Sequence, residues 1–218
     1  MESALRGLNA RIFWFHSCEA NTDSVLRFRR ELFVDKLGWA LSVSGQFEVD
    51  EFDAPGTCFV ALSQNDHIVG AFRAIRTDFP YLAEKVFPTL AVTRNYPKTS
   101  QSYEISRFGI EPGPNREVIA NTLYALMFHF ALIRRAKSLV AVTDLFHERY
   151  LSKRNIRTRR FGPPSAYTQQ DSRSFKLVAG EIPIASQDQE SLHRILSSLN
   201  GVHIHDETLV FGRQGISA

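Results

Sequence analysis

The chain has 218 residues, of which 44% are hydrophobic, so it can bury one sizeable core. A formal charge of only +3 excludes a polycation, and two cysteines are too few for a disulfide framework or a structural zinc site. No apolar run approaches the roughly eighteen residues of a membrane span, and the N-terminus lacks a secretory signal pattern. We therefore expect one cytoplasmic domain over residues 1–218, with no membrane or metal partner.

The first predicted elements in chain order are a strand, a helix and a hairpin. Residues 10–15 (ARIFWF) are rich in β-formers and predict the strand. Helical spacing then runs from about residue 23 to residue 36, and Asn21, Thr22 or Asp23 is available as its cap. Two β-rich runs flank the polar sequence SQND within residues 57–77, which predicts the hairpin.

The later elements alternate between strands and helices. Residues 103–110 (YEISRFGI) predict a strand, and residues 116–138 carry apolar side chains at three- and four-residue steps, which predicts the longest helix. The remaining predictions are a buried strand at 139–146, a short helix at 147–155, a strand at 174–184, a helix at 186–199 and an apolar run at 207–212. Hairpins and helices around one sheet predict an α/β protein, a three-layer α/β/α sandwich with a mixed central sheet.

Four charged residues interrupt apolar patterns. Arg29 lies on the apolar stripe of the first helix, Arg73 alternates with apolar residues in the hairpin, and Glu104 and Arg107 lie inside the strand 103–110. A single arginine could extend its charged end to water, but burying an unpaired charge is costly. Four interruptions together indicate a charged pocket in which acid and guanidinium groups pair with each other or with a zwitterionic ligand.

An acidic run and a basic run each allow two interpretations. In residues 47–56 (FEVDEFDAPG), Asp50 and Asp53 are either part of a solvated loop or a carboxylate pair that holds a cation. The basic run KRNIRTRR is either a solvated loop or a site for a polyanion, nucleic acid or acidic protein. It has no interleaved aromatic residue, so we do not expect nucleic acid. Its basic residues are Lys153, Arg154, Arg157, Arg159 and Arg160.

Common catalytic motifs are absent from the sequence. It contains no nucleophile elbow, HExxH, P-loop or GxGxxG pattern. His203 and His205 have the spacing of surface residues on a strand, and no histidine pair has the spacing of metal ligands.

In order and spacing, the charged and aromatic residues resemble the acyl-homoserine lactone synthases of bacterial quorum sensing, the LuxI type. The resemblance covers roughly residues 25–165, with Tyr103 where the family usually has Trp and Ala71 where Cys is common. The residues that carry it are Arg29-x3-Phe33-x5-Trp39, Asp50-x2-Asp53, Arg73, Phe87 in VFP, and Glu104-x-Ser106-Arg107-Phe108.

The resemblance implies a fold like the GCN5-type N-acetyltransferases and a specific transfer reaction. An acyl group passes from an acyl carrier protein thioester to the amine of S-adenosylmethionine. The substrate's own carboxylate then closes a lactone and releases methylthioadenosine. S-adenosylmethionine is thus a substrate, and no cofactor is implied. The acidic carrier protein would dock at the basic run 153–160.

The catalytic set that the resemblance implies is Glu104, Ser106 and Arg107. Glu104 would act as the base that takes the amine proton, directly or through water. Strict strand alternation sends Glu104 and Arg107 to opposite faces, so they share a task only if a β-bulge lies between them.

The implied substrate-binding residues divide by chemistry. The two aspartates would hold the ammonium and sulfonium end, the arginines would pair with the substrate carboxylate or with the acidic loop, and the aromatic residues would line the adenosine or sulfonium site. Thr143 matches a position that the family associates with 3-oxo-acyl recognition, although threonine is also simply a good β-former. The full set is Arg29, Phe33, Trp39, Asp50, Asp53, Arg73, Phe87 and Thr143.

Two alternatives stay open. The first is a coenzyme A-dependent N-acyltransferase of the same architecture, for which EPGPNRE (residues 111–117) is a poor version of the pyrophosphate loop. The second is a non-catalytic regulatory module that binds a polyanion through the basic run, with affinity that falls steeply with salt.

Overall fold

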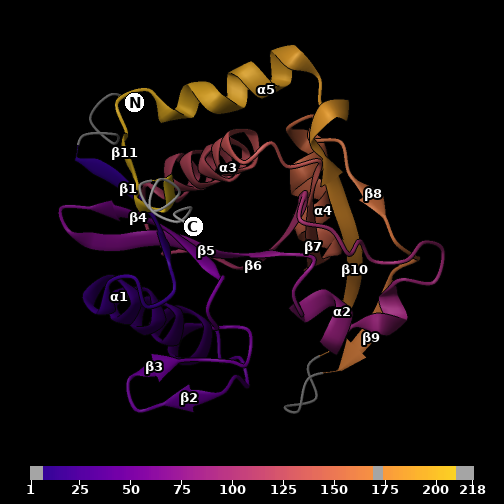
Figure 1. Ribbon diagram of the computed structural model, residues 1–218, viewed down its shortest axis with the longest axis horizontal. Coiled ribbons are helices and arrows are strands. Elements are labelled where there is room, and N and C mark those ends of the chain that lie inside the picture. Colours follow the sequence, from indigo (N-terminus) through magenta and orange to yellow (C-terminus); the bar gives the residue numbers. More distant parts are fainter. Residues whose placement is uncertain (1–6, 169–173, 210–218) are drawn as a thin grey trace, which may run out of the picture. The chain divides into compact units, whose positions relative to one another are not determined.

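The computed structural model describes residues 7–168 and 174–209, which form two compact units (Figure 1). The first unit contains residues 7–74, 107–126 and 198–209, and the second contains the rest of the described chain. Strands β5 (His67–Arg76) and β6 (Ser102–Ile110) and helix α3 (Arg116–Ile133) contribute residues to both. The expectation of a single domain stays a prediction.

In the first unit the strands follow the order β11-β1-β4-β5-β6. Strand β1 (Leu8–Trp14) pairs in parallel with β11 (His203–Asp206) and antiparallel with β4 (Cys58–Gln64). Strands β4 and β5 form the predicted hairpin. Asn65 and Asp66 both take positive φ at its turn, as a tight hairpin turn requires. The first predicted strand, the hairpin and the surface-strand placement of the two histidines are thus confirmed.

The first helix begins earlier than predicted and changes its winding. Helix α1 (Glu19–Arg29) starts after Cys18, and the Thr22 hydroxyl inside it accepts a bond from His16 N at 3.2 Å, so the predicted cap at residues 21–23 is wrong. The helix continues as a π-helix, Arg30–Lys36. This wider winding shifts the side-chain register. A regular α-helix would place Leu37 on the apolar stripe that contains Arg29, but Leu37 is 43% exposed. The short strands β2 (Val43–Ser44) and β3 (Phe47–Glu48) follow.

Helices cover both faces of the sheet in the first unit (Figure 1). On one face the π-helix approaches β6 closely at Gly109, where an added Cβ would lie 2.5 Å from Leu32 Cδ2 and 2.8 Å from Phe33 Cζ. On the other face α3 approaches β5 at Gly70, where a Cβ would lie 3.3 Å from Leu123 Cδ2. Glycine at 109 is therefore what permits the close packing of the π-helix.

The second unit continues the mixed pairing, with strand order β6-β7-β10-β8 and β9 paired to β10. Strand β7 runs parallel to β6 and antiparallel to β10. On β6, Tyr103 packs against Phe130 of α3, while the next residue, Glu104, contacts the start of α2. The elements of this unit are α2 (Leu82–Val86), β7 (Ser138–Asp144), α4 (Leu145–Lys153), β8 (Arg159–Arg160), β9 (Ser165–Thr168), β10 (Ser174–Pro183) and α5 (Gln189–Leu196).

A mixed sheet with helices on both faces occurs in each unit, so the predicted α/β class with a mixed sheet is confirmed. Sequence periodicity missed α2, the β2–β3 pair and the short strands β8 and β9, because each is shorter than two helical turns or a typical strand. Four 3-10 turns complete the described elements: Pro88–Leu90, Ile184–Ser186, Ser197–Leu199 and Glu207–Leu209. Residues 210–212 of the last predicted apolar run lie outside the described residues. Within the described ranges, no helix is both long and apolar enough to cross a membrane.

Candidate functional site

Arg29 is buried at the centre of an ion-pair network in the first unit, with a side chain that is 1% exposed. Its Nη1 and Nη2 donate to the two carboxylate oxygens of Asp53, at 2.8 and 2.9 Å, and its Nε donates to Glu48 Oε2 at 2.5 Å. A guanidinium group matches a carboxylate in this two-bond geometry. The two hydrogen bonds replace bonds to water that both groups lose on burial. The predicted pairing of Arg29 with the acidic run is therefore present.

The acidic loop folds on itself and receives a second arginine. Asp53 Oδ2 accepts a bond from Asp50 N and Asp50 Oδ1 accepts one from Phe52 N, each at 2.9 Å. Arg73 Nη1 donates to Asp53 Oδ1 at 2.9 Å and also to Asp50. The Arg73 guanidinium carbon lies 5.7 Å from the centre of the Phe52 ring. The acidic run is thus paired with arginine side chains of the same chain and is not a solvated loop.

Arg107 joins the same network because the backbone of β6 is irregular at this residue. Its φ is 51°, in the left-handed region that residues other than glycine seldom adopt. Its Nη2 donates to Glu48 Oε1 at 2.9 Å and to Asp50 Oδ2 at 2.7 Å. The side chain of Arg107 thus reaches the acidic loop, and a β-bulge between Glu104 and Arg107 stays a prediction.

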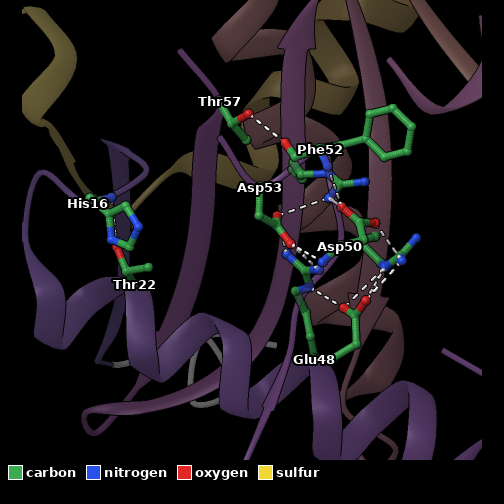
Figure 2. Close-up of polar contacts among 10 residues, drawn as sticks. His16, Thr22, Glu48, Asp50, Phe52, Asp53 and Thr57 are labelled. Atoms are coloured by element: carbon green, nitrogen blue, oxygen red, sulfur yellow. Dashed lines mark hydrogen bonds and ion pairs between the residues drawn. The ribbon is translucent and has the colours of Figure 1, made fainter. Parts of the chain in front are cut away.

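Glu48 is the site residue that sequence reasoning missed. It is fully buried and accepts bonds from Arg29 and Arg107. Figure 2 shows the side chains of Glu48, Asp50 and Asp53 converging. The contact between His16 and Thr22 lies at a separate place in the same view. We call these three acids, with Arg29, Arg73 and Arg107, the charged network; its six formal charges cancel.

The network shifts the pKa values of Asp53 and Arg29. Burial alone would raise the pKa of Asp53, but the bonds from Arg29 and the charges of Arg73 and Arg29 lower it to about 2. For Arg29, burial opposes the charge, yet the bonds and charge of Asp53 raise its pKa above the usual value. Both groups therefore stay charged across the physiological range. Most of the network is inaccessible, but the side chains of Asp50 and Arg107 are 14% and 8% exposed.

Phe33 and Trp39 form an aromatic pair in the same unit. Their rings stack at 5.0 Å with an interplanar angle of 26°, and Trp39 N donates to Phe33 O at 2.8 Å. Phe33 is buried in the core, whereas Trp39 is 38% exposed. The pair thus presents one aromatic ring to solvent on a buried aromatic support.

Glu104 and Ser106 belong to the second unit and are buried, 1% and 8% exposed. Glu104 Oε2 accepts a bond from Leu82 N at 3.1 Å, and Oε1 accepts one from Ala83 N at 2.6 Å, both at the start of α2. Burial raises the pKa of the Tyr96 phenol, and the nearby charge of Glu104 raises it further. The predicted base thus receives two backbone amides at the start of α2.

Phe87 and Thr143 are half-buried residues of the second unit. Phe87 follows α2, its ring lies 5.5 Å from that of Tyr167 in an edge-to-face arrangement, and its carbonyl accepts a bond from the Tyr96 hydroxyl at 2.9 Å. Thr143 lies on β7 opposite Val178 of β10.

Two arginines of the basic run form ion pairs. Arg159 donates to Glu181 at 2.6 and 2.9 Å, and Arg160 donates to Glu148 at 2.5 and 2.7 Å. Burial would raise the pKa of Glu181, but its bonds from Arg159 and Arg94 hold it below the usual value. Two of the five basic residues are therefore neutralised by carboxylates. Lys153 and Arg157 are exposed, and the Arg154 guanidinium lies 3.5 Å from the Tyr150 ring centre.

Over the described ranges, no group of three or more His, Cys, Asp or Glu side chains is suited to a metal ion.

Comparisons with known proteins identify the family and the fold of the chain. The family profile described as autoinducer synthase matches residues 15–192. An acyl-homoserine-lactone synthase of Vibrio anguillarum is 26% identical over 165 residues, which cover 73% of this chain and 86% of that protein. The solved structure of BjaI, a CoA-dependent acyl-homoserine lactone synthase with SAM and isopentyl-CoA, is similar with a TM-score of 0.79 at 20% identity, over 92% of this chain and 94% of that chain.

A putative N-acetyltransferase from Lactobacillus plantarum is similar in fold, with a TM-score of 0.52 at 14% identity over 81% of this chain and 99% of that chain. The expected likeness to the N-acetyltransferase fold is thus confirmed. Because the family profile spans most of the sequence, the chain belongs to the autoinducer synthase family and is an acyltransferase of the acyl-homoserine-lactone synthase type.

Proposed function

We propose that the chain acylates the amine of S-adenosylmethionine from an acyl thioester and then closes the product to a homoserine lactone. In the first step the amine nitrogen attacks the thioester carbonyl, an amide forms, and the donor leaves as a thiol. In the second step a carboxylate oxygen attacks the γ-carbon, the carbon–sulfur bond breaks, and the sulfonium leaves with the electron pair as neutral methylthioadenosine.

The observation that carries this proposal is the accessible end of the charged network. Asp50 and Arg107 are its most exposed members and form an ion pair at 2.7 Å. An amino-acid substrate brings an ammonium group and a carboxylate, so it can replace this one pair by two, ammonium with Asp50 and carboxylate with Arg107. The four buried members hold these two in place, which limits the reorganisation needed on binding.

The aromatic pair suits the other end of the same substrate. Trp39 is exposed and stacks on Phe33, so its outer face is available to a sulfonium or an adenine ring. A cation over an indole face gains about 0.5–1 kcal/mol at an exposed site and more when water is excluded. BjaI was solved with SAM, which supports this class of substrate for a chain of the same fold.

Glu104 is the proposed acceptor of the amine proton. Its two oxygens accept the Leu82 and Ala83 amides, which hold the carboxylate in one orientation, and an ionised carboxylate can act as general base for an amine directly or through a bridging water. Ser106 lies on the same strand, and we assign Phe87 and Thr143 to the acyl donor. A 3-oxo group on that chain would accept a hydrogen bond from the Thr143 hydroxyl.

For the acyl donor we propose a carrier protein that docks on α4. Phe146, Arg149 and Lys153 are spaced three and four residues apart and therefore share one face of this helix. All three are exposed, Phe146 to 75%. A basic face with one apolar side chain suits an acidic protein surface. The alternative donor is a coenzyme A thioester, which the likeness to a CoA-dependent synthase favours.

The deciding experiment incubates the purified chain with S-adenosylmethionine and matched acyl-carrier-protein or acyl-coenzyme A donors, and quantifies products by mass spectrometry. We expect acyl-homoserine lactone and methylthioadenosine in equal amounts. An N-acyl product without methylthioadenosine would identify a simple N-acyltransferase. No product from either donor would refute the synthase activity, and salt-sensitive polyanion binding that is independent of Glu104 would then indicate the regulatory module.

A further inference from the structure

Helix α2 obtains its N-terminal cap from a distant strand. The first amides of any helix lack partners within the helix. Tyr81 occupies the cap position of α2, but its side chain makes no capping bond, and its hydroxyl donates to Pro97 O at 2.8 Å. The amides of Leu82 and Ala83 donate instead to the carboxylate of Glu104, 22 and 21 residues further along the chain.

This bond pair is a principal constraint on α2. The helix has five residues, Leu82–Val86, and a helix this short has little stability of its own. Hydrogen bonds to an ionised carboxylate are stronger than bonds between neutral groups, and the carboxylate also complements the helix dipole. Because Glu104 is 1% exposed, water competes little for these bonds.

The position of α2 in turn sets the position of Phe87. Phe87 N donates to Ala83 O at 3.2 Å, so the residue whose amide binds Glu104 also holds the backbone of Phe87. The Tyr96 hydroxyl holds the Phe87 carbonyl, and Tyr167 contacts its ring. We propose that Glu104 has a second role as the positioning residue of Phe87 in the donor site. This inference rests on the proposed function, which assigns Phe87 to the acyl donor.

The second role changes how the usual test of a catalytic glutamate is read. In Glu104→Gln, one carboxylate oxygen becomes an amide nitrogen, which cannot accept a bond from Leu82 or Ala83. That variant therefore removes the proposed base and disturbs the cap at the same time. Separating the two roles requires a change that leaves the carboxylate in place.

A pair of substitutions at residue 82 makes this separation. Leu82→Pro and Leu82→Ala both lose the leucine side chain, but only proline also loses the amide that donates to Glu104. Proline is tolerated in the first helical turn, and Tyr81 before it is extended (φ −141°, ψ 160°), as a residue before proline prefers. The alanine variant is thus a matched control for the loss of one hydrogen bond.

In steady-state kinetics we expect the KM for the acyl donor to be about tenfold higher in Leu82→Pro than in Leu82→Ala, as for the loss of a charge-assisted bond. The KM for S-adenosylmethionine and the pH profile of kcat should be equal in the two variants. Equal donor KM values would overturn the inference, and so would a loss confined to kcat, because the bond would then act on the base.

Two further measurements keep the outcome unambiguous. If Leu82→Pro does not fold, replacing residue 82 by leucic acid substitutes an ester for the amide and keeps the side chain, with the same kinetic expectation. The wild-type chain is assayed alongside. If it forms no lactone, the proposed function fails; if it does and the donor KM is insensitive to the bond, only this inference fails.

Discussion

Arg29 and Asp53 form a two-bond ion pair that is fully enclosed in the first unit, with Arg29 also bonded to Glu48. Lysine has no planar fork and reproduces at most part of this geometry. Arg29→Lys should therefore lower the free energy of unfolding by about 3–5 kcal/mol, the usual cost of breaking a buried pair. Urea unfolding measures the change. Arg27→Lys, on an exposed position of the same helix, should stay within about 0.5 kcal/mol of wild type, and a similar loss in both variants would contradict the argument.

The depressed pKa of Asp53 makes stability depend on acid pH. Its folded pKa of about 2 lies below the ordinary 3.8, so its ionised form stabilises the fold by about 2 kcal/mol, fully above pH 4. This contribution is lost as the pH falls from about 4 through 2. The difference in unfolding free energy between wild type and Asp53→Asn should therefore shrink over this interval. A constant difference from pH 5 to pH 2 would disprove the assignment.

Gly109 should be intolerant of a methyl group, because a Cβ there would lie within 2.8 Å of both Leu32 and Phe33 side-chain atoms. Overpacking of this kind costs about 1–3 kcal/mol. Displacement of Phe33 should also loosen its stack with Trp39, so Gly109→Ala should bind S-adenosylmethionine more weakly by calorimetry. Gly113→Ala is the control, since nothing lies within 4 Å of its added Cβ. Unchanged stability and affinity in Gly109→Ala would show that the π-helix adjusts freely.

Glu104→Gln should reduce turnover by roughly a hundred- to ten-thousand-fold, as loss of a general base does. S-adenosylmethionine affinity should change little, because the proposed ligands of that substrate belong to the charged network. Single-turnover kinetics with saturating substrates measures the chemical step. A folded glutamine variant with near-normal turnover would remove Glu104 from the proposed mechanism.

Docking of a carrier protein should depend on Lys153 and Arg157 more than on Arg159 and Arg160, whose charges are already paired with carboxylates. Reversing Lys153 and Arg157 to Glu should raise the KM for the carrier protein and reduce its salt dependence, because exposed charges are screened over about 8 Å at physiological salt. Arg159 is left in place, since a carboxylate there would face Glu181.

The matched control for this charge change is the reversal of Arg135 and Lys137, which are exposed after α3. It should leave the carrier-protein KM unchanged. Equal effects from the two double reversals would indicate long-range attraction without a docking site. An unchanged KM in the Lys153 and Arg157 variant would place docking elsewhere.

Most members of the charged network were predictable from sequence, because each is recognisable in its own segment. Arg29, Arg73 and Arg107 each interrupt an apolar pattern, and a buried guanidinium must find a carboxylate. The acidic run supplied Asp50 and Asp53. Glu48 could also have been predicted, because residues 48 and 50 of an extended segment share one face.

The partner of Glu104 was not predictable in the same way. Glu104 accepts bonds from α2, a five-residue helix whose sequence LAEKV is too short to show a helical period. The early start of α1 was not predicted. Its π-helical continuation was not predicted either, because α-helical and π-helical windings use the same residue types. The ion pairs of Arg159 and Arg160 were not predictable either, because their partners Glu181 and Glu148 lie in other elements.

The charged network also imposes an order in time on the newly made chain. Glu48 accepts from Arg29, 19 residues before it, and from Arg107, 59 residues after it. At roughly 5–20 residues per second, several seconds of translation separate the first partner from the second. From the synthesis of Asp53 until that of Arg107, the three carboxylates of the network outnumber its arginines. The network therefore reaches neutrality only once the ribosome has made Arg107 within β6, and the proposed substrate-binding end can mature only after that point.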